Sequence, residues 1–319
     1  MSRAPTAAVE PSRERLGNPL LRYFLATRPA FLTITLVGVL LGFATAWHSG
    51  VPFSGLDAAV TLLLALLAHA GVNVLNDYYD HLNGTDAVNS DRLFPFTGGS
   101  RFIQNGVLSP RQTLLFGLLL FLAVMLGGQW LLGRAGPGLL WIGLGGLFIG
   151  WAYSAPPLQL NSRGLGELCV AAGFLLIVAG ADFVQRHVFA STAWLIGLPY
   201  ALMVTNILYI NQFPDRAADL AVGKRHWVTR LAPERAAHGY GLILLLAAGW
   251  LLGLVASGTL PAWSLIVLLA VLPAFRAAID LRRFADQPRQ LANAIRATIV
   301  AAHLLAVLLA VSLILDRFL

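Results

Sequence analysis

Two clusters of acidic and amide side chains are the residues of this sequence best suited to chemistry. Their members are Asn73, Asn76, Asp77, Asp80, Asn83 and Asp86 in the run NVLNDYYDHLNGTD, and Asn211, Asp215 and Asp219 in the run NQFPDRAAD. If each run is helical, the intervals of three and four residues place most of each cluster on one helical face. The side chains of a cluster then converge on one spot instead of being spread around the helix.

Converging carboxylates imply a bound cation, because like charges repel one another and an unpaired buried charge is costly. Hard oxygen ligands without histidine or cysteine suit Mg²⁺ better than Zn²⁺. Mg²⁺ takes few protein carboxylates and shares its shell with substrate phosphates. Two facing clusters therefore predict two or three Mg²⁺ ions bridging a diphosphate. A solvated helix end explains one cluster equally well, but two clusters at matching positions favour the metal site.

Basic residues follow both clusters and suit the same substrate. Lys224 and Arg225 come after the second cluster, and Arg92 and Arg101 come after the first. Such donors bind diphosphate oxygens as that group departs. Arg28 lies at the start of the first long apolar block, where a helix N-terminus also favours anions. The alternative for each arginine is a purely topological role at a membrane surface.

The elements that carry these clusters are predicted to be membrane helices. Of the 319 residues 57% are hydrophobic and 12% are charged, whereas a soluble domain carries about 25% charged residues. The apolar residues form blocks of about 20, the length that crosses about 30 Å of hydrocarbon. The single cysteine, Cys169, excludes an internal disulfide framework and a cysteine metal cluster. The predicted spans are 24–47, 58–77, 113–133, 137–153, 164–184, 193–212, 239–256, 260–278 and 295–315.

The expected fold is an all-α integral membrane bundle of about nine transmembrane helices. Each acidic cluster follows an even-numbered span and leads into a long loop, which indicates two pseudo-repeated halves with cytoplasmic Asp-rich loops. Residues 1–18 are predicted to form a flexible cytoplasmic tail. Residues 19–319 are predicted to form a single transmembrane domain.

The distribution of charge predicts the orientation of the bundle. With the N-terminus in the cytoplasm, all 22 lysine and arginine residues except Arg134, Arg186 and Arg317 fall on the cytoplasmic side. This assignment places the N-terminus and both clusters at the cytoplasmic face of the cytoplasmic (inner) membrane. Topology and contacts with lipid headgroups explain the net charge of +7, so nucleic-acid binding is not expected.

The two motifs together resemble those of the UbiA family of membrane prenyltransferases. NDYYDHLNGTD is similar to the first aspartate-rich motif of that family, and NQFPDRAADLAVGKRHWVTRL is similar to the second. The resemblance implies transfer of a polyprenyl group from polyprenyl diphosphate to an aromatic acceptor, with Mg²⁺. TGGSRFIQNGVLSP and YSAPPLQLNSRGLGEL resemble the branch that acts on 1,4-dihydroxy-2-naphthoate in menaquinone biosynthesis. The 4-hydroxybenzoate branch typically has a lysine four residues after the tyrosine that corresponds to Tyr153. Here that position is Pro157, which favours the naphthoate as acceptor.

The resemblance also implies roles for individual residues. Metal ligands are expected among Asn76, Asp77, Asp80, Asp86, Asn211, Asp215 and Asp219. Catalytic roles are expected for Asp80, Asp215, Lys224, Arg225, Arg101, Tyr153 and Glu167, and substrate contacts for Arg28, Asn76, Asn211, Arg92, Tyr78, Tyr79 and Tyr209.

Two of these assignments have alternatives. The tyrosines near the membrane boundary suit cation–π stabilisation of an allylic cation, but tyrosine is also a common interfacial anchor. Glu167, at the start of the fifth span, is a candidate acceptor contact or base, or an acid that complements the helix dipole.

Two other classes of membrane protein fit the sequence less well than a prenyltransferase does. A CDP-alcohol phosphotransferase would carry one cluster of the form D-x-x-D-G-x-x-A-R, but here the clusters are far apart and His81 follows Asp80. A transporter would carry its ionisable residues near the middle of its helices, but these lie at helix ends. Among acceptors, 4-hydroxybenzoate or another phenol is the alternative to the naphthoate. The sequence carries no signal for prenyl length or oligomeric state.

Overall fold

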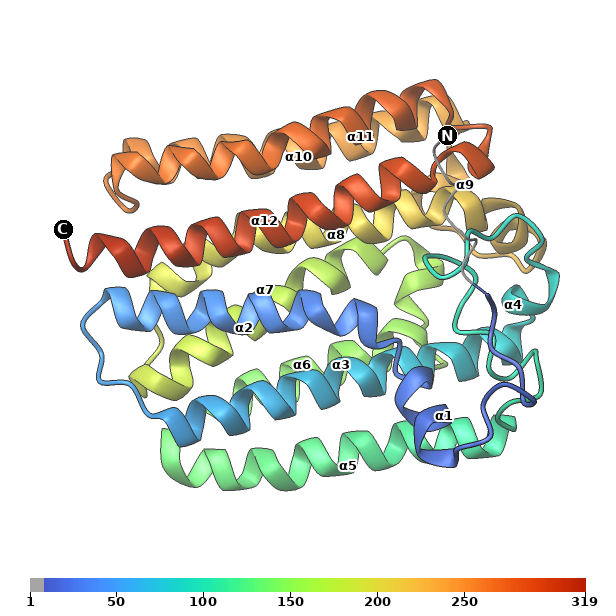
Figure 1. Cartoon of the computed structure of the whole chain (residues 1–319), viewed down its shortest axis with the longest axis horizontal. Coiled ribbons are helices and arrows are strands. Elements are labelled where there is room, and N and C mark those ends of the chain that lie inside the picture. Colours follow the sequence, from blue (N-terminus) through green and yellow to red (C-terminus); the bar gives the residue numbers. More distant parts are fainter. Residues whose placement is uncertain (1–8) are drawn as a thin grey trace.

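The long apolar blocks form helices, because a backbone that crosses hydrocarbon must satisfy its hydrogen bonds within its own segment. The computed structural model describes residues 9–319, and that range contains helices and no strand (Figure 1). Within residues 9–319, eight helical segments are long and apolar enough to span a membrane. They are α2 (Pro29–His48), α3 (Gly55–Asn83), α5 (Pro110–Ala135), α7 (Gly166–Arg186), α8 (Ser191–Ala221), α10 (Pro233–Ala256), η2 with α11 (Ala262–Ala270 and Val271–Arg283), and α12 (Ala292–Asp316).

A ninth apolar helix, α6 (Leu139–Ser154), is shorter than the others. Its 16 residues extend about 24 Å at a rise of about 1.5 Å per residue, less than the hydrocarbon thickness of about 30 Å. It nevertheless packs against α7 and α3 within the bundle. Each of the nine predicted spans thus coincides with a helix, eight of them have spanning length, and the membrane crossing of α6 stays a prediction.

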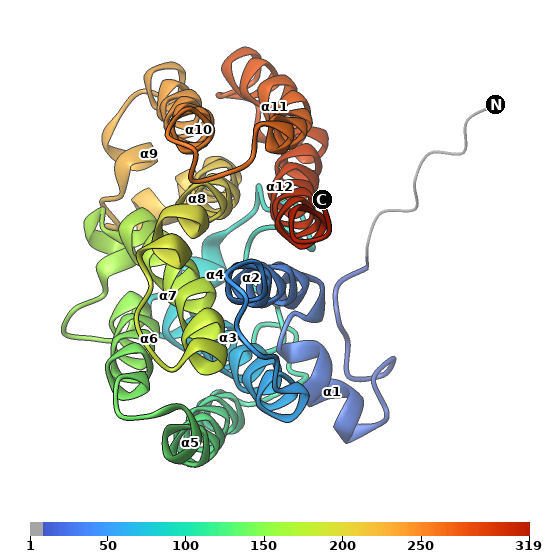
Figure 2. The same cartoon turned by 90° about the vertical axis from the view of Figure 1, so that its left-hand side faces the viewer.

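Short helices gather at one end of the bundle, here called the loop end. They are α1 (Pro19–Ala26), α4 (Thr85–Val88), η1 (Leu160–Arg163), α9 (Trp227–Arg230) and η3 (Pro288–Gln290). The C-terminus lies at the opposite end (Figure 1). Viewed along the helices, α5 and α6 lie on one side and α10 and α11 on the other, with α2, α3, α7, α8 and α12 between them (Figure 2). This central group encloses the space described below.

The acidic residues lie on helices to a greater extent than predicted. Helix α3 continues to Asn83 and α8 continues to Ala221, whereas the predicted spans end at 77 and 212. Gly84, with a φ of 85°, provides the left-handed C-cap of α3. Pro214 lies inside the continuous helix α8 and is buried there. The Asp-rich loops of the prediction are therefore mainly helix ends, and only Asp86 of the two clusters follows its helix.

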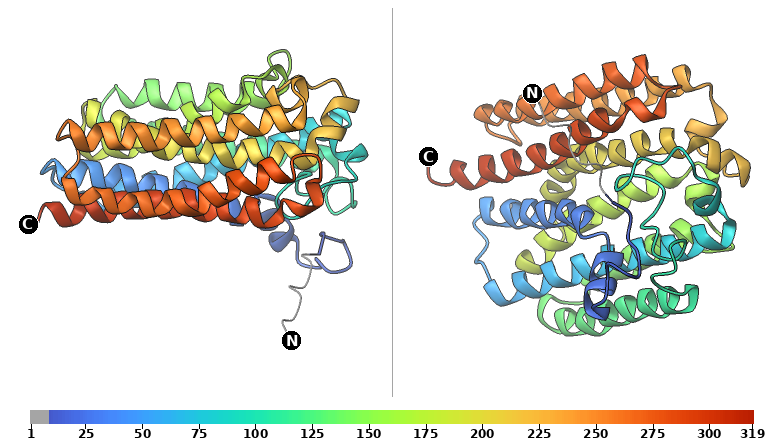
Figure 3. Two further views of the ribbon diagram at one scale, coloured as in Figure 1. Left: turned by 90° about the horizontal axis from the view of Figure 1, so that it is seen from above. Right: turned by 45° about the vertical axis from the view of Figure 1, so that its right-hand side comes forward.

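The N-terminal segment lies against the first long loop. Arg92 Nε donates to Glu10 Oε1 at 2.7 Å, and Asn105 Nδ2 donates to the Pro11 carbonyl at 2.9 Å. Leu16 is buried against Phe102 and its neighbours. Residues 9–18 of the predicted flexible tail are thus held on the loop end (Figure 3), and residues 1–8 lie outside the described part of the chain.

Candidate active site

A cavity of about 350 Å³ lies at the loop end, between α2, α3, α7, α8 and α12. Part of its lining is polar and includes four carboxylates and one lysine: Asp80, Asp86, Asp215, Asp219 and Lys224. Another part is apolar and includes Ile34, Phe174, Val204, Ile207 and Ile299. A cavity built in this way suits an amphiphile with a hydrocarbon tail and a polar head that a bound cation joins to the carboxylates.

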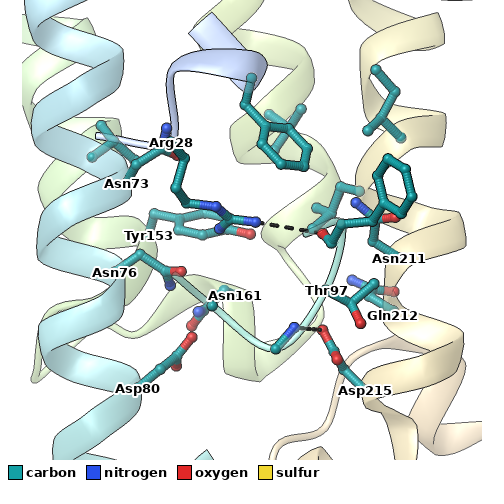
Figure 4. A pocket seen from close by; sticks show the side chains of 18 of the residues that line it. Arg28, Asn73, Asn76, Asp80, Thr97, Tyr153, Asn161, Asn211, Gln212 and Asp215 are labelled. Atoms are coloured by element: carbon teal, nitrogen blue, oxygen red, sulfur yellow. Dashed lines mark hydrogen bonds between the residues drawn. The ribbon is translucent and has the colours of Figure 1, made fainter. Parts of the chain in front are cut away.

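Helices α3 and α8 line the cavity with matching stripes of residues. On α3 the stripe runs through Val72, Asn76 and Asp80, and on α8 it runs through Ile207, Asn211 and Asp215 at the same intervals of four. These intervals keep each stripe on one helical face. Figure 4 shows the amides and carboxylates of the two helices on facing walls. The weak internal repeat of the sequence thus forms two halves of one site.

The first long loop closes over the carboxylates. Gly98 N donates to Asp215 Oδ2 at 3.4 Å, and Ser100 N donates to Asp77 Oδ1 at 3.1 Å. Gly99 has a φ of 72°, and a Cβ atom there would lie 2.7 Å from Asp86 Oδ2. Only glycine therefore allows the backbone to approach both acidic clusters so closely.

Lys224 connects the two clusters. Its Nζ lies 2.9 Å from Asp80 Oδ1 and 3.1 Å from Asp219 Oδ1. Burial alone would lower the pKa of Lys224, but these two carboxylates outweigh it and raise the pKa above its ordinary range. The ammonium therefore stays charged. His226 Nε2 lies 3.0 Å from the other oxygen of Asp219 and completes its environment.

The donor set fits a hard divalent cation. Burial raises the pKa of the Asp86 carboxyl well above its ordinary range, and the neighbouring carboxylates of Asp80 and Asp77 raise it further. A cation would reverse that effect. The side-chain carbonyl oxygens of Asn89 and Asn211 are buried without a hydrogen-bond partner. Between residues 9 and 319, no three His, Cys, Asp or Glu side chains are close enough to hold a metal by themselves, so a ligand would have to complete the shell.

Many of the predicted site residues line this cavity. They are Arg28, Asn76, Asp80, Asp86, Tyr153, Asn211, Asp215, Asp219 and Lys224. Arg28 lies between α1 and α2 with a φ of 58°, and its guanidinium donates to the Phe96 carbonyl at 3.4 Å. Asn76 donates to Ser154 Oγ at 2.9 Å, which leaves its carbonyl oxygen available.

The other predicted site residues do not line the cavity. Arg225 is exposed, Arg92 is paired with Glu10, and the buried Arg101 donates to the Asp86 carbonyl. Arg92 and Arg101 therefore hold the N-terminal segment and the first long loop in place, and Arg225 faces away from the cavity. The buried Asp77 lies beneath the loop, where it accepts the hydrogen bond from Ser100.

Three of the predicted tyrosines and Glu167 also lie outside the cavity lining. Tyr78 and Tyr79 pack against each other with ring centroids 5.1 Å apart. The Tyr209 hydroxyl donates to the Ala236 carbonyl at 2.8 Å. Glu167 lies behind Gln212 and accepts a hydrogen bond from it. None of these four side chains lines the cavity.

Several lining residues are absent from the sequence-based assignment. Five of them are Asn89, Thr97, Asn161, Gln212 and His226. Gln212 alone carried a signal, because it lies four positions after the lining residue Leu208 and three before Asp215 on the α8 stripe. The other four come from loops and from the short helix η1, where no long periodicity indicates the direction of a side chain.

Comparisons with known proteins agree with this geometry. Residues 35–300 match the model of the UbiA prenyltransferase family. A 1,4-dihydroxy-2-naphthoate octaprenyltransferase from Haemophilus influenzae is 30% identical over 246 residues, 74% of this chain and 78% of that protein. A protein of the same name from Bacillus subtilis is 28% identical over 271 residues, 82% of this chain and 81% of that protein.

A solved structure shares the fold. The structure of a UbiA homologue from Archaeoglobus fulgidus bound to GPP and Mg²⁺ superposes with a TM-score of 0.57 and 15% identity, covering 92% of this chain and 99% of that one. The family model matches most of the sequence, and the matched segment contains both acidic clusters. The chain therefore belongs to the UbiA prenyltransferase family and is a multi-pass membrane enzyme of that family.

Proposed function

We propose that this prenyltransferase transfers a polyprenyl group from its diphosphate to 1,4-dihydroxy-2-naphthoate, in a Mg²⁺-dependent reaction that yields the quinol form of a demethylmenaquinone. The cavity that is polar on one side and apolar on the other carries this proposal. The names of the relatives from Haemophilus influenzae and Bacillus subtilis support the choice of acceptor. The positive-inside bias supports a site that faces the cytoplasm from the cytoplasmic membrane.

The metal ions would be held at the carboxylate side of the cavity. Their ligands would come from Asn76, Asp80, Asp86, Asn211, Asp215 and Asp219, with Asp77 supporting the loop above them. Bound Mg²⁺ supplies charge neutralisation for the departing diphosphate. Lys224 and Arg28, the two cationic side chains of lysine or arginine in the lining, add fixed positive charge where negative charge develops.

The bond changes follow from the chemistry of the two substrates. The bond between prenyl C1 and the diphosphate oxygen breaks, and its electron pair leaves with the diphosphate. The electron-rich ring then forms a carbon–carbon bond to C1 at the carbon that bears the carboxylate. Loss of that carboxylate as CO₂ returns an electron pair to the ring. Tyr153 in the cavity wall offers a π-face to the allylic cation, and the tail lies along the apolar lining.

The test is a prenyl-transfer assay on membranes that contain the protein. Farnesyl diphosphate and Mg²⁺ are supplied with either 1,4-dihydroxy-2-naphthoate or 4-hydroxybenzoate. A Mg²⁺-dependent product from the naphthoate alone is expected. A product from 4-hydroxybenzoate alone would keep the reaction class and overturn the acceptor. The absence of product with both, in membranes where insertion has been verified, would overturn both acceptors.

A further inference from the structure

Glu167 and Gln212 form a part-buried pair beside the cavity. Gln212 Nε2 donates to Glu167 Oε1 at 3.0 Å, from α8 to the first turn of α7. An ionised carboxylate only accepts hydrogen bonds, whereas a glutamine amide has one donating and one accepting side. The NH₂ group of Gln212 must therefore face Glu167. The carboxylate thus fixes which way round the amide lies.

The other side of that amide has no protein partner. Gln212 is 7% exposed and lines the cavity, and its Oε1 atom is buried without a hydrogen bond. Buried polar atoms are nearly always paired. The oxygen of Gln212 is thus an unused acceptor that a bound molecule can satisfy with a donor.

The position of Gln212 narrows the kind of donor. It lies three residues before Asp215 on α8, about 4.5 Å along the helix axis, and hence closer to the apolar lining of that helix. A diphosphate anion offers oxygens that accept hydrogen bonds, and a prenyl chain has no donor. A hydroxyl of the aromatic acceptor is a donor, and the ring must lie within about 3.5 Å of prenyl C1 to react.

We propose that Gln212 accepts a hydrogen bond from a ring hydroxyl of the acceptor and that Glu167 acts as its positioning residue. Gln212 is then a specificity-determining residue that selects hydroxylated aromatic acceptors. This inference rests on the proposed prenyl transfer. A hydroxyl that donates to an amide oxygen also releases more electron density into its ring, so the contact aids attack by the ring carbon.

The experiment compares 1,4-dihydroxy-2-naphthoate with 1-hydroxy-2-naphthoate and 4-hydroxy-2-naphthoate, each of which lacks one hydroxyl. Wild type should prefer the dihydroxy compound over one of these analogues by about 10-fold or more in kcat/KM. Gln212→Leu should lower that ratio several-fold, to the value set by the intrinsic reactivities of the two rings. Glu167→Leu, which cannot accept the hydrogen bond from Gln212, should raise the acceptor KM about 10-fold and leave the KM for farnesyl diphosphate and the Mg²⁺ requirement unchanged. Cys169→Ser, a buried position on the same turn of α7 outside the cavity, is the control for altered packing.

A double-mutant cycle tests whether Glu167 acts through Gln212. In the Gln212→Leu background, Glu167→Leu should have no further effect on the acceptor KM. An unchanged preference between acceptors in Gln212→Leu overturns the proposal. If Gln212→Leu instead raises the Mg²⁺ concentration needed for half-maximal rate, Gln212 is a metal ligand and the proposal is overturned.

Failure of the proposed function is distinct from failure of this inference. If the proposed function is wrong, the wild-type protein shows no prenyl transfer. If only this inference is wrong, the wild type is active and the variants keep its preference for the dihydroxy acceptor. If a variant is inactive, thermal shift of the purified protein by each naphthoate replaces turnover. A larger shift by the dihydroxy compound in wild type, lost in Gln212→Leu, supports the proposal, and an equal loss of shift for all three compounds overturns it.

Discussion

The ammonium of Lys224 lies 2.9 Å from the carboxylate of Asp80, although 144 positions separate them in the chain. Lys224 also lies 3.1 Å from Asp219, so one cation from the second loop joins the acidic ends of α3 and α8. The two halves of the site thus converge on a charge that the protein itself supplies. A diphosphate that enters the cavity meets an ammonium already held between two carboxylates.

Replacing Lys224 by methionine should reduce kcat by about 100-fold or more, because a fixed charge at the leaving group is removed. Lys224→Arg should recover part of the activity because it restores the charge with a different shape. The measurement is initial rate at saturating farnesyl diphosphate. Arg225→Gln is the matched control, because Arg225 is adjacent and exposed and does not line the cavity. Near wild-type turnover in Lys224→Met would contradict the role given to this lysine.

Asp80→Asn and Asp215→Asn should each reduce turnover by about 100-fold or more and raise the Mg²⁺ concentration needed for half-maximal rate. Each change removes a charged ligand and keeps the size of the side chain, so the bundle should fold normally. Asp91→Asn is the control. Asp91 follows the same cluster, but its nearest cationic partner is the exposed Arg289 at 3.7 Å. An unaltered Mg²⁺ dependence in both Asp80→Asn and Asp215→Asn would contradict the assignment of these two residues as metal ligands.

The helices and the positions of the clusters were predictable because both depend on local periodicity. Blocks of about 20 apolar residues coincide with helices of the structure, and intervals of four place Asn76 with Asp80 and Asn211 with Asp215 on the cavity wall. The ends of α3 and α8 were less predictable. Hydropathy falls where polar residues begin, whereas hydrogen bonding continues through Pro214 to Ala221.

The side chains on loops were not predictable from the sequence. Arg92, Arg101 and Arg225 follow the acidic clusters in the chain, yet none of them lines the cavity. The direction of each side chain depends on backbone conformation, such as the positive φ of Arg101, and on tertiary partners, such as Glu10 for Arg92. Tyr209 lies on α8 one position beyond the lining residue Leu208, and its side chain is buried against α10 instead of facing the cavity. Proximity in sequence to a reactive cluster did not imply proximity to the cavity.

Gly99→Ala should abolish most activity, because its Cβ would lie 2.7 Å from Asp86 Oδ2 and push the first loop off the carboxylates. Gly106→Ala separates this clash from backbone strain. Gly106 also has a positive φ, 65°, but a Cβ there meets no atom within 4 Å. Both variants should lose about 1–2 kcal/mol of stability from the left-handed conformation, measured by thermal unfolding in detergent. Only Gly99→Ala should lose turnover, and equal activities in the two would argue against a close-fitting loop.

The N-terminal segment should detach from the first loop at acidic pH. Burial raises the pKa of Glu10, but hydrogen bonds from Arg92 and Asn105 outweigh it, and the net pKa is below the ordinary 4.5. A carboxyl group with a lowered pKa stabilises the docked state above about pH 4.5 and loses that contribution as pH falls through its pKa in the folded protein. Hydrogen exchange of residues 9–18, corrected for the intrinsic pH dependence, should therefore increase below about pH 4. Glu10→Gln should show the faster exchange already at pH 7, whereas Glu14→Gln, at an exposed position of the same segment, should resemble wild type. Equal protection in Glu10→Gln and wild type at pH 7 would mean that Leu16 and its apolar neighbours hold the segment without the ion pair.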